Sequence, residues 1–263
     1  MSYAKRCLLL LALAVPALAS FSSWASESVR LDRVPADVKP NDTVSLQRGA
    51  HVYVNYCLGC HGLAYMRFNR LRDLGLSEQQ IRDNLMPTEA KVGDLMKIAM
   101  DAKNAKDWFG APPPDLSVIA RSRASGDGSG ADWLYSYLRG FYRDPSRPTG
   151  WNNTVFANVG MPHVLYQLQG VQVLKAETVE RRFGPKEEEV DRREVVRLVL
   201  EKPGTMAPAE YDRMVADLVN FLVYVGEPSR GTRETLGIYV LMFLGVLFVL
   251  AYLLKKEFWK DVH

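Results

Sequence analysis

The chain has 263 residues, 48% of them hydrophobic, which is enough for one globular core together with targeting and anchoring segments. Its formal charge of +3 is carried by the two ends, because residues 7–254 contain as many basic as acidic side chains. Basic residues are interleaved with acidic ones and form no cluster, which excludes nucleic acid as a partner.

Residues 1–25 have the pattern of a signal peptide. Two basic residues precede an apolar stretch, residues 8–19, that is too short to span a bilayer. Cleavage after Ala19 or after Ala25 fits this pattern equally well. The sequence therefore predicts export of the chain.

A helix is predicted over residues 43–57, after a polar extended arm. Apolar residues recur in it at intervals of three to four, so one face is buried: Leu46, Ala50, Tyr53 and Cys57. Gly49 costs this helix about 1 kcal/mol relative to alanine. A close crossing with another helix explains that glycine, and a tolerated accident is the alternative.

Cys57-Leu58-Gly59-Cys60-His61 is typical of a c-type cytochrome. Two thiols at this spacing can bond to the two vinyl groups of one haem, and the histidine that follows is placed to ligate the iron. The remaining cysteine lies in the leader, so neither a disulfide scaffold nor a zinc scaffold is expected. A redox dithiol is the alternative, but it does not require His61. His51 precedes the motif on the same helix and is expected at the surface.

Two further helices are predicted after the motif. One has a capping box from Ser77 to Gln80, and the other covers residues 88–102, with Met96 and Met100 as packing residues. Ala111-Pro112-Pro113-Pro114-Asp115-Leu116-Ser117 then forms a stiff segment that suits a wall against a flat macrocycle.

Either Arg121 or Arg123 can pair with a haem propionate, and two solvated arginines are the alternative. Residues 125–131 form a glycine-rich loop that lacks the lysine of a phosphate loop, so we expect a mobile segment. Asp132 is predicted to cap a helix that ends at Gly140 and brings aromatic side chains to the core or the haem edge.

The long loop over residues 143–161 is of the kind that delivers a ligand. A sixth iron ligand is needed, and position leaves Met161, Met206, Met86 and His163 as candidates. Residue spacing alone cannot choose between them. Met161 ends the long loop while Met206 directly precedes a helix, which favours Met161 over Met206, with the other two behind, and leaves the choice open. A thioether ligand would raise the reduction potential relative to a second imidazole.

Two short strands, residues 171–174 and 195–200, flank a charged stretch that is expected to be a solvated excursion. A docking site for a basic partner is the alternative. A helix from Pro208 to about Gly226 follows, and it should cross the helix that contains Gly49. Its buried stripe is predicted to be Met214, Leu218, Phe221, Leu222 and Val225.

Residues 236–254 carry no charge and would form about 28 Å of helix, close to the roughly 30 Å of a hydrocarbon core. Lysines follow this anchor, which places the short tail in the cytoplasm. The predicted parts are a signal peptide (1–25), a periplasmic haem domain (26–234), a transmembrane anchor (235–255) and a cytoplasmic tail (256–263).

These motifs, in this order, resemble the cytochrome c1 family, the haem c subunit of the quinol:cytochrome c oxidoreductase (bc1) complex. The resemblance covers most of residues 45–254. It is carried by Ser45-Leu46-Gln47-Arg48-Gly49, Val52-Tyr53, Tyr56-Cys57-Leu58-Gly59-Cys60-His61, Pro113-Pro114-Asp115-Leu116-Ser117, Arg121, Arg123, Pro148-Thr149-Gly150, Met161-Pro162 and residues 221–228.

The resemblance implies a mainly α, class I cytochrome c-like haem domain with inserted loops and a short β-hairpin, plus one C-terminal transmembrane helix. It implies one covalent haem c, attached at Cys57 and Cys60, with His61 and Met161 as axial ligands. Arg123 becomes the expected propionate partner and Pro114 part of the haem wall, while Met206 becomes structural.

The implied partners are cytochrome b, the Rieske iron-sulfur protein as electron donor, and a soluble or tethered cytochrome c as acceptor. The implied location is the bacterial inner membrane, with the haem domain in the periplasm. Two departures from the family are Trp108-Phe109 before the prolines and a long insert over residues 169–204, which leaves the acceptor's docking surface open.

The sequence contains no recognisable acid, base or nucleophile constellation, so the chain is expected to carry electrons rather than act as an enzyme on its own. Two alternatives remain. One is a sensor or enzyme subunit whose sixth ligand opens to oxygen, nitric oxide or peroxide. The other is an anchored cytochrome c of a terminal oxidase or a dehydrogenase.

Overall fold

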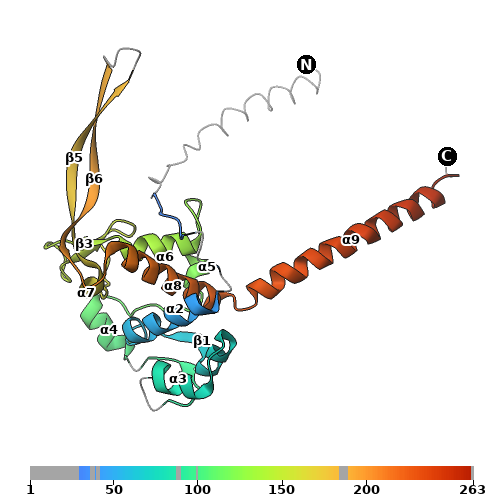
Figure 1. Ribbon diagram of the computed structural model, residues 1–263, viewed down its shortest axis with the longest axis horizontal. Coiled ribbons are helices and arrows are strands. Elements are labelled where there is room, and N and C mark those ends of the chain that lie inside the picture. Colours follow the sequence, from blue (N-terminus) through green and yellow to red (C-terminus); the bar gives the residue numbers. More distant parts are fainter. Residues whose placement is uncertain are drawn as a thin grey trace, which may run out of the picture. The chain divides into compact units, whose positions relative to one another are not determined.

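The structure is a computed structural model that describes residues 30–35, 39, 42–86, 90–98, 100–183 and 189–261. Within these residues the chain is mainly helical, with three separate two-stranded antiparallel sheets (Figure 1). The helices are α2 (Thr43–Tyr56), the 3-10 helix η1 (Phe68–Leu74), α3 (Glu78–Leu85), α4 (Ala102–Phe109), α5 (Ile119–Ser122), α6 (Gly130–Arg139), α7 (Tyr166–Gln169), α8 (Pro208–Gly226) and α9 (Arg230–Phe258). The strands pair as β1 (Leu63–Arg67) with β2 (Leu95–Met96), β3 (Phe141–Arg143) with β4 (Trp151–Asn153), and β5 (Gly170–Phe183) with β6 (Glu189–Pro203).

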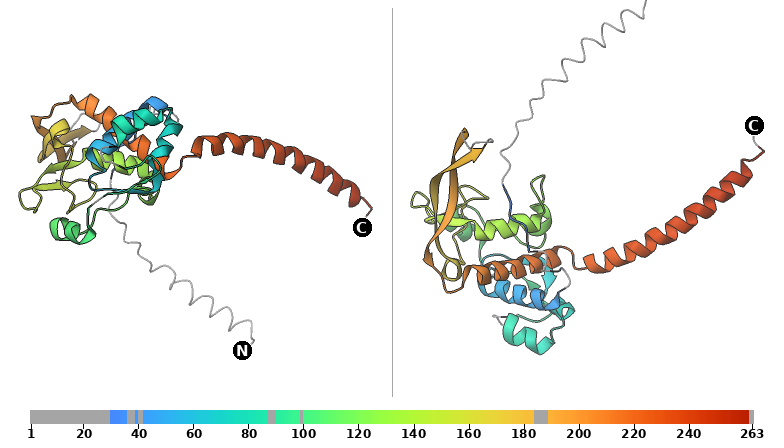
Figure 2. Two further views of the ribbon diagram at one scale, coloured as in Figure 1. Left: turned by 90° about the horizontal axis from the view of Figure 1, so that it is seen from below. Right: turned by 45° about the horizontal axis from the view of Figure 1, so that its top comes forward.

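Helices α2 and α8 lie side by side at the centre of the core (Figures 1 and 2). Gly49 allows this approach, because a Cβ there would lie 2.1 Å from the carbonyl oxygen of Asp217 and 2.7 Å from Cβ of Phe221. Arg48 spans the crossing with two hydrogen bonds to the Asp217 carboxylate, of 2.6 and 3.1 Å. The predicted crossing and the role of Gly49 are confirmed.

The predicted helices around the crossing are confirmed together with their ends. Asp42 caps α2 by accepting hydrogen bonds from the backbone of Val44 and Ser45. Pro208 opens α8, and the five residues predicted as its stripe are all buried. Ser77 and Gln80 form the expected capping box at the start of α3.

The helix predicted over residues 88–102 is wrong for the part of that stretch that the structure describes. Residues 90–98 contain a turn and then β2, which pairs with β1. The turn is closed locally, since the Asp94 carboxylate accepts from the backbone N–H of Lys91. Met96 is fully buried, as the packing prediction requires, and the helix begins later, at Ala102.

The start of α6 also differs from its prediction. Ser129, not Asp132, caps the helix, and Asp132 instead accepts a hydrogen bond from the backbone of Val34. The helix begins at Gly130. Glycine is required at this position because a Cβ there would lie 2.0 Å from the Ala120 carbonyl oxygen. Part of the glycine-rich loop is thus a tight contact between α5 and α6, a tertiary requirement that local sequence does not reveal.

The hairpin of β5 and β6 is longer than the two short strands that the sequence predicts, and it forms a long two-stranded ribbon (Figure 1). Pairing continues through the charged stretch because backbone hydrogen bonds do not depend on apolar side chains. An ion pair across the two strands also favours the pairing, because Arg197 of β6 lies 3.6 Å from Glu177, its diagonal neighbour on β5. At the base of the hairpin, Gly170 is buried.

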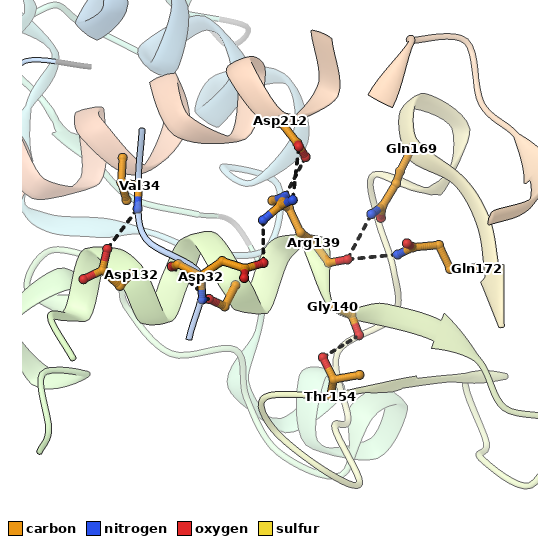
Figure 3. A network of polar contacts seen from close by, with 10 residues as sticks. Asp32, Val34, Asp132, Arg139, Gly140, Thr154, Gln169, Gln172 and Asp212 are labelled. Carbon is orange, nitrogen blue, oxygen red and sulfur yellow. Dashed lines mark hydrogen bonds and ion pairs between the residues drawn. The ribbon is translucent and has the colours of Figure 1, made fainter. Parts of the chain in front are cut away.

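Arg139, near the end of α6, joins several distant segments (Figure 3). Its guanidinium pairs with Asp212 of α8 at 2.5 Å and with Asp32 of the N-terminal arm at 2.8 Å. Its carbonyl oxygen accepts hydrogen bonds from the side chains of Gln169 and Gln172, at 3.0 and 2.9 Å. This network fixes the arm, α8 and the hairpin base to the helix that borders the site.

Helix α9 is long and apolar enough to cross a membrane, and none of its residues is buried. It starts before the predicted anchor and ends after it, so the apolar segment is contained within one continuous helix. The predicted signal peptide, residues 1–25, lies outside the described residues.

Candidate haem-binding site

A cavity of about 300 Å³ lies between the end of α2, the prolines, α6, α8 and the loop that ends at Met161. Its walls are mostly apolar, as in pockets that hold a large organic group. Six residues predicted for a haem site line it together: Cys57, Cys60, His61, Pro114, Arg123 and Met161. The sequence predicted these residues from separate stretches, and the fold brings them to one place.

The cysteine motif is a turn that continues from the end of α2. The backbone N–H groups of Cys57 and His61 donate to the carbonyls of Tyr53 and Cys57, both at 2.8 Å. The Tyr53 hydroxyl donates to the His61 carbonyl at 2.5 Å and ties the end of the motif to the core. Because the cysteines lie one turn apart, both side chains face the same cavity.

The His61 ring is oriented by the proline segment. Its Nδ1 lies 2.7 Å from the carbonyl oxygen of Pro114, and because a carbonyl only accepts, Nδ1 must carry the proton. The other nitrogen, Nε2, is then deprotonated and able to ligate a metal. Burial also lowers the pKa of His61, which keeps the ring neutral.

The proline segment is itself fastened to the chain that follows the motif. The Asp115 carboxylate accepts from the backbone N–H groups of Ala64 and Ser117, at 2.7 and 2.8 Å. The backbone N–H of Leu116 donates to the carbonyl of Gly62 at 2.9 Å. The Pro114 carbonyl is therefore held at a fixed position relative to His61.

Met161 lines the cavity at the end of an irregular loop, and Tyr137 of α6 donates its hydroxyl to the Met161 sulfur at 3.4 Å. Asn153 holds the loop's start, because its side chain donates to the carbonyl of Tyr137 and accepts from the backbone of Val155 and Phe156. The sequence analysis did not find these roles of Tyr137 and Asn153, since nothing local signals them.

The other candidates for the sixth ligand lie elsewhere. Met206 and Met86 pack against the main hydrophobic core, and neither is among the described residues that line the cavity. His163 is buried, and its ring stacks on Phe141 with centroids 4.8 Å apart. His51 is exposed, as predicted. Among the described candidates, Met161 is the one that lines the cavity.

Arg123 and Arg121 have different positions in the structure. The residue pattern did not separate them, and the family resemblance favoured Arg123. Arg123 lines the cavity, with its guanidinium carbon 4.6 Å from the Trp133 ring centre and 5.7 Å from that of Phe156. Arg121 is exposed and lies against Gly226. No ion pair to Arg123 is found among the residues that the structure describes, so its charge is available to an anion in the cavity.

The lining residues fit a haem c. Burial and the neighbouring Cys60 raise the pKa of the Cys57 thiol to about 12, so Cys57 lacks the stabilised thiolate of a reactive redox cysteine. No group of three metal-binding side chains occurs in the described part of the chain, which argues against a zinc site there. An apolar cavity with two thiols, a neutral imidazole nitrogen and a thioether instead matches the chemistry of covalently attached, six-coordinate haem.

Comparison with known proteins agrees with this site. A sequence model of the Cytochrome C1 family matches residues 37–186 and 199–262, and the gap falls in the second half of the hairpin. The chain is 52% identical to a Nitrosomonas europaea protein named ammonia monooxygenase gamma subunit, over 94% of this chain and 95% of that protein. It is 49% identical to cytochrome c1 of Allochromatium vinosum (87% and 88% covered) and 29% identical to cytochrome c1 of Rhodospirillum rubrum (84% and 83% covered). With most of its length matched and its cavity suited to haem c, this chain belongs to the cytochrome c1 family.

Proposed function

We propose that this chain takes electrons from a Rieske iron-sulfur protein and passes them to a c-type cytochrome. Membership of the family makes it a membrane-anchored electron-transfer subunit of a bc1 complex that carries one covalent haem c and is not an enzyme by itself. The proposal adds the donor, the acceptor, the side of the membrane and the residues that hold the haem.

In this proposal Cys57 and Cys60 would attach the haem through thioether bonds, and His61 Nε2 and the Met161 sulfur would ligate its iron. The single observation that supports it most is that these four residues, from segments 100 residues apart, line one apolar cavity. The bound haem supplies a one-electron carrier. The Pro114 carbonyl holds the His61 ring in place, and Arg123 pairs with a propionate.

Several residues that line the cavity reach the surface, and two of them are aromatic. Tyr56 and Phe156 line the cavity and are also exposed, with 39% and 46% of their surface accessible. They place an edge of the cavity within reach of a partner's redox centre. With His61 and Met161 both supplied by the protein as iron ligands, the chain would move electrons and would not bind a substrate at the iron.

The haem domain is proposed to face the periplasm. Lys255 and Lys256 lie in the last turn of α9, and basic residues collect at the cytoplasmic end of a membrane helix. The predicted signal peptide, outside the described residues, would export everything that precedes α9.

Replacement of the two competing methionines tests the ligand assignment. Met161→Leu should abolish the near-infrared methionine-to-iron band of the oxidised protein, and Met206→Leu should leave it unchanged. Carbon monoxide added to the reduced wild-type protein should not alter its spectrum. A band that survives in Met161→Leu, or a wild-type haem that binds carbon monoxide readily, would contradict the assignment.

Gentle solubilisation of the membranes tests the proposed partners. Cytochrome b and a Rieske protein should purify with this chain, and the assembly should reduce a c-type cytochrome when quinol is added. Copurification with an oxidase or a dehydrogenase instead would favour the alternative of an anchored cytochrome c in another complex.

A further inference from the structure

We propose that Tyr137 tunes the haem of this chain by donating a hydrogen bond to the sulfur of Met161 and so raises the reduction potential. Tyr137 would act through Met161 and is therefore a positioning residue. The inference rests on the proposed function, because it requires that Met161 be the axial ligand.

The contact between the two side chains has suitable geometry. The Tyr137 oxygen lies 3.4 Å from Sδ of Met161, a normal donor distance for the large sulfur atom. A thioether has two lone pairs, so the sulfur can give one to a metal and accept the hydroxyl proton with the other. Both residues line the cavity, and the contact therefore lies at its wall.

The position of the Tyr137 hydroxyl is fixed by its neighbours. The ring stacks on Trp133, with centroids 4.9 Å apart and planes 12° from parallel, and meets the edge of Phe141 at 5.2 Å. Asn153 donates to the backbone carbonyl of Tyr137 at 2.7 Å and also begins the loop that ends at Met161. The donor and the acceptor are thus held by shared contacts, and the hydroxyl has little freedom to turn away.

The sign of the effect follows from electrostatics. The oxidised site carries one more positive charge than the reduced site. The O–H group directs its positive end toward the sulfur and draws electron density from it, which disfavours the oxidised state. A preorganised dipole in an apolar cavity is weakly screened, so the effect is not lost to solvent.

Tyr137→Phe in the full-length protein tests the inference, because it keeps the stacked ring and removes only the donor. The equilibrium constant for reduction should fall about two- to tenfold, and a tenfold fall corresponds to 59 mV in the midpoint potential of a one-electron couple. The methionine-to-iron band should remain but shift in energy, since the sulfur becomes a stronger electron donor.

Tyr135→Phe is the matched control. Tyr135 lies on the same helix and is buried, but its ring faces the Arg139 guanidinium at 4.5 Å and is not among the residues that line the cavity. The midpoint potential and the methionine-to-iron band of Tyr135→Phe should equal those of the wild type. Redox titration and near-infrared spectra of all three proteins give the comparison.

The outcomes separate this inference from the proposed function. A wild-type protein without the band would overturn the ligand assignment and this inference with it. If the wild type has the band, equal potentials and equal band energies in Tyr137→Phe would overturn this inference alone. Complete loss of the band in Tyr137→Phe would also overturn it, because the hydroxyl would then be needed to keep Met161 bound.

Discussion

At the residue scale, His61 shows how a neighbouring backbone decides the chemistry of a side chain. The motif places the imidazole one residue after Cys60, but the Pro114 carbonyl, 53 positions along the chain, determines which ring nitrogen carries the proton. The segment that the sequence marks as a stiff wall therefore has a second role, because its carbonyl prepares Nε2 for a metal.

Gly49→Ala should destabilise the fold by about 1–3 kcal/mol, the usual cost of overpacking. The added Cβ would meet the Asp217 carbonyl, which is backbone and cannot turn aside. Chemical denaturation measures the change. Gly93→Ala is the control, because nothing lies within 4 Å of a Cβ there, and it should have little effect. Equal stabilities of the two variants would contradict the close crossing.

At the element scale, the loop before Met161 is ordered by polar side chains rather than by regular structure. Asn152 accepts a hydrogen bond from the backbone of Asn158 at 2.8 Å, and Arg147 donates to the Asn158 carbonyl at 3.0 Å. Asn158 has a φ of 60°, a left-handed conformation that asparagine tolerates better than most residues. These contacts give the loop one shape, and that shape determines where the Met161 sulfur lies.

Asn153→Ala should destabilise the protein by about 2 kcal/mol, because the Tyr137 carbonyl loses one of its two donors and two backbone N–H groups lose the Asn153 acceptor. The methionine-to-iron band should also broaden or weaken as the loop loosens. Thr154→Ala serves as the control, since Thr154 is exposed and its hydroxyl makes a long contact of 3.4 Å. A band and a stability equal to those of the control would show that the loop does not depend on Asn153.

The hairpin tip should be dispensable for the haem site. We expect that replacing residues 178–194 with an Asn-Gly turn leaves the midpoint potential and the unfolding midpoint unchanged. The retained pairs, up to Glu177 opposite Val195, include the base where Gln172 donates to the carbonyls of Arg139 and Phe141. Quinol-driven reduction of a c-type cytochrome should also be unchanged. A fall in that rate at constant potential would instead make the hairpin a docking element.

At the scale of the whole molecule, the haem domain and the anchor are energetically separate. None of the residues of α9 is buried, and near the domain its exposed Arg233 pairs with the half-buried Glu227, a contact at the surface that contributes little. The buried core is instead formed by α2, α8 and the elements around them. The domain is therefore expected to fold without its anchor.

A chain that ends at Glu227 should remain in solution without detergent, keep its covalent haem and show the wild-type midpoint potential. Fractionation and redox titration of the truncated protein, beside the full-length protein in detergent, measure this. A truncated chain that fails to retain haem or that aggregates would show that α9 supports the domain.

Much of the fold was predictable because it depends on the spacing of apolar residues along each helix and on the residues that begin and end the helices. Capping side chains mark the starts of α2 and α3, and a proline at the first position marks the start of α8. The expected mainly α, cytochrome c-like class with one apolar C-terminal helix is confirmed by the family match. The helix over residues 88–102 was wrong, because strand pairing with β1 overrides a modest helical pattern. The cap of α6 was misplaced, because contacts with Ala120 and Val34 decide it.

The sequence by itself indicated the chemistry of this protein. The Cys57-Leu58-Gly59-Cys60-His61 motif, the stiff prolines and the uncharged stretch are each recognised from consecutive residues. The residue pattern and the family resemblance favoured Met161 and Arg123, but only the tertiary structure shows that both line one cavity with that motif and that Tyr137 contacts the Met161 sulfur. The reason is physical: those choices depend on distances between segments remote along the chain, and such distances are fixed by packing around α2 and α8 and not by local preference.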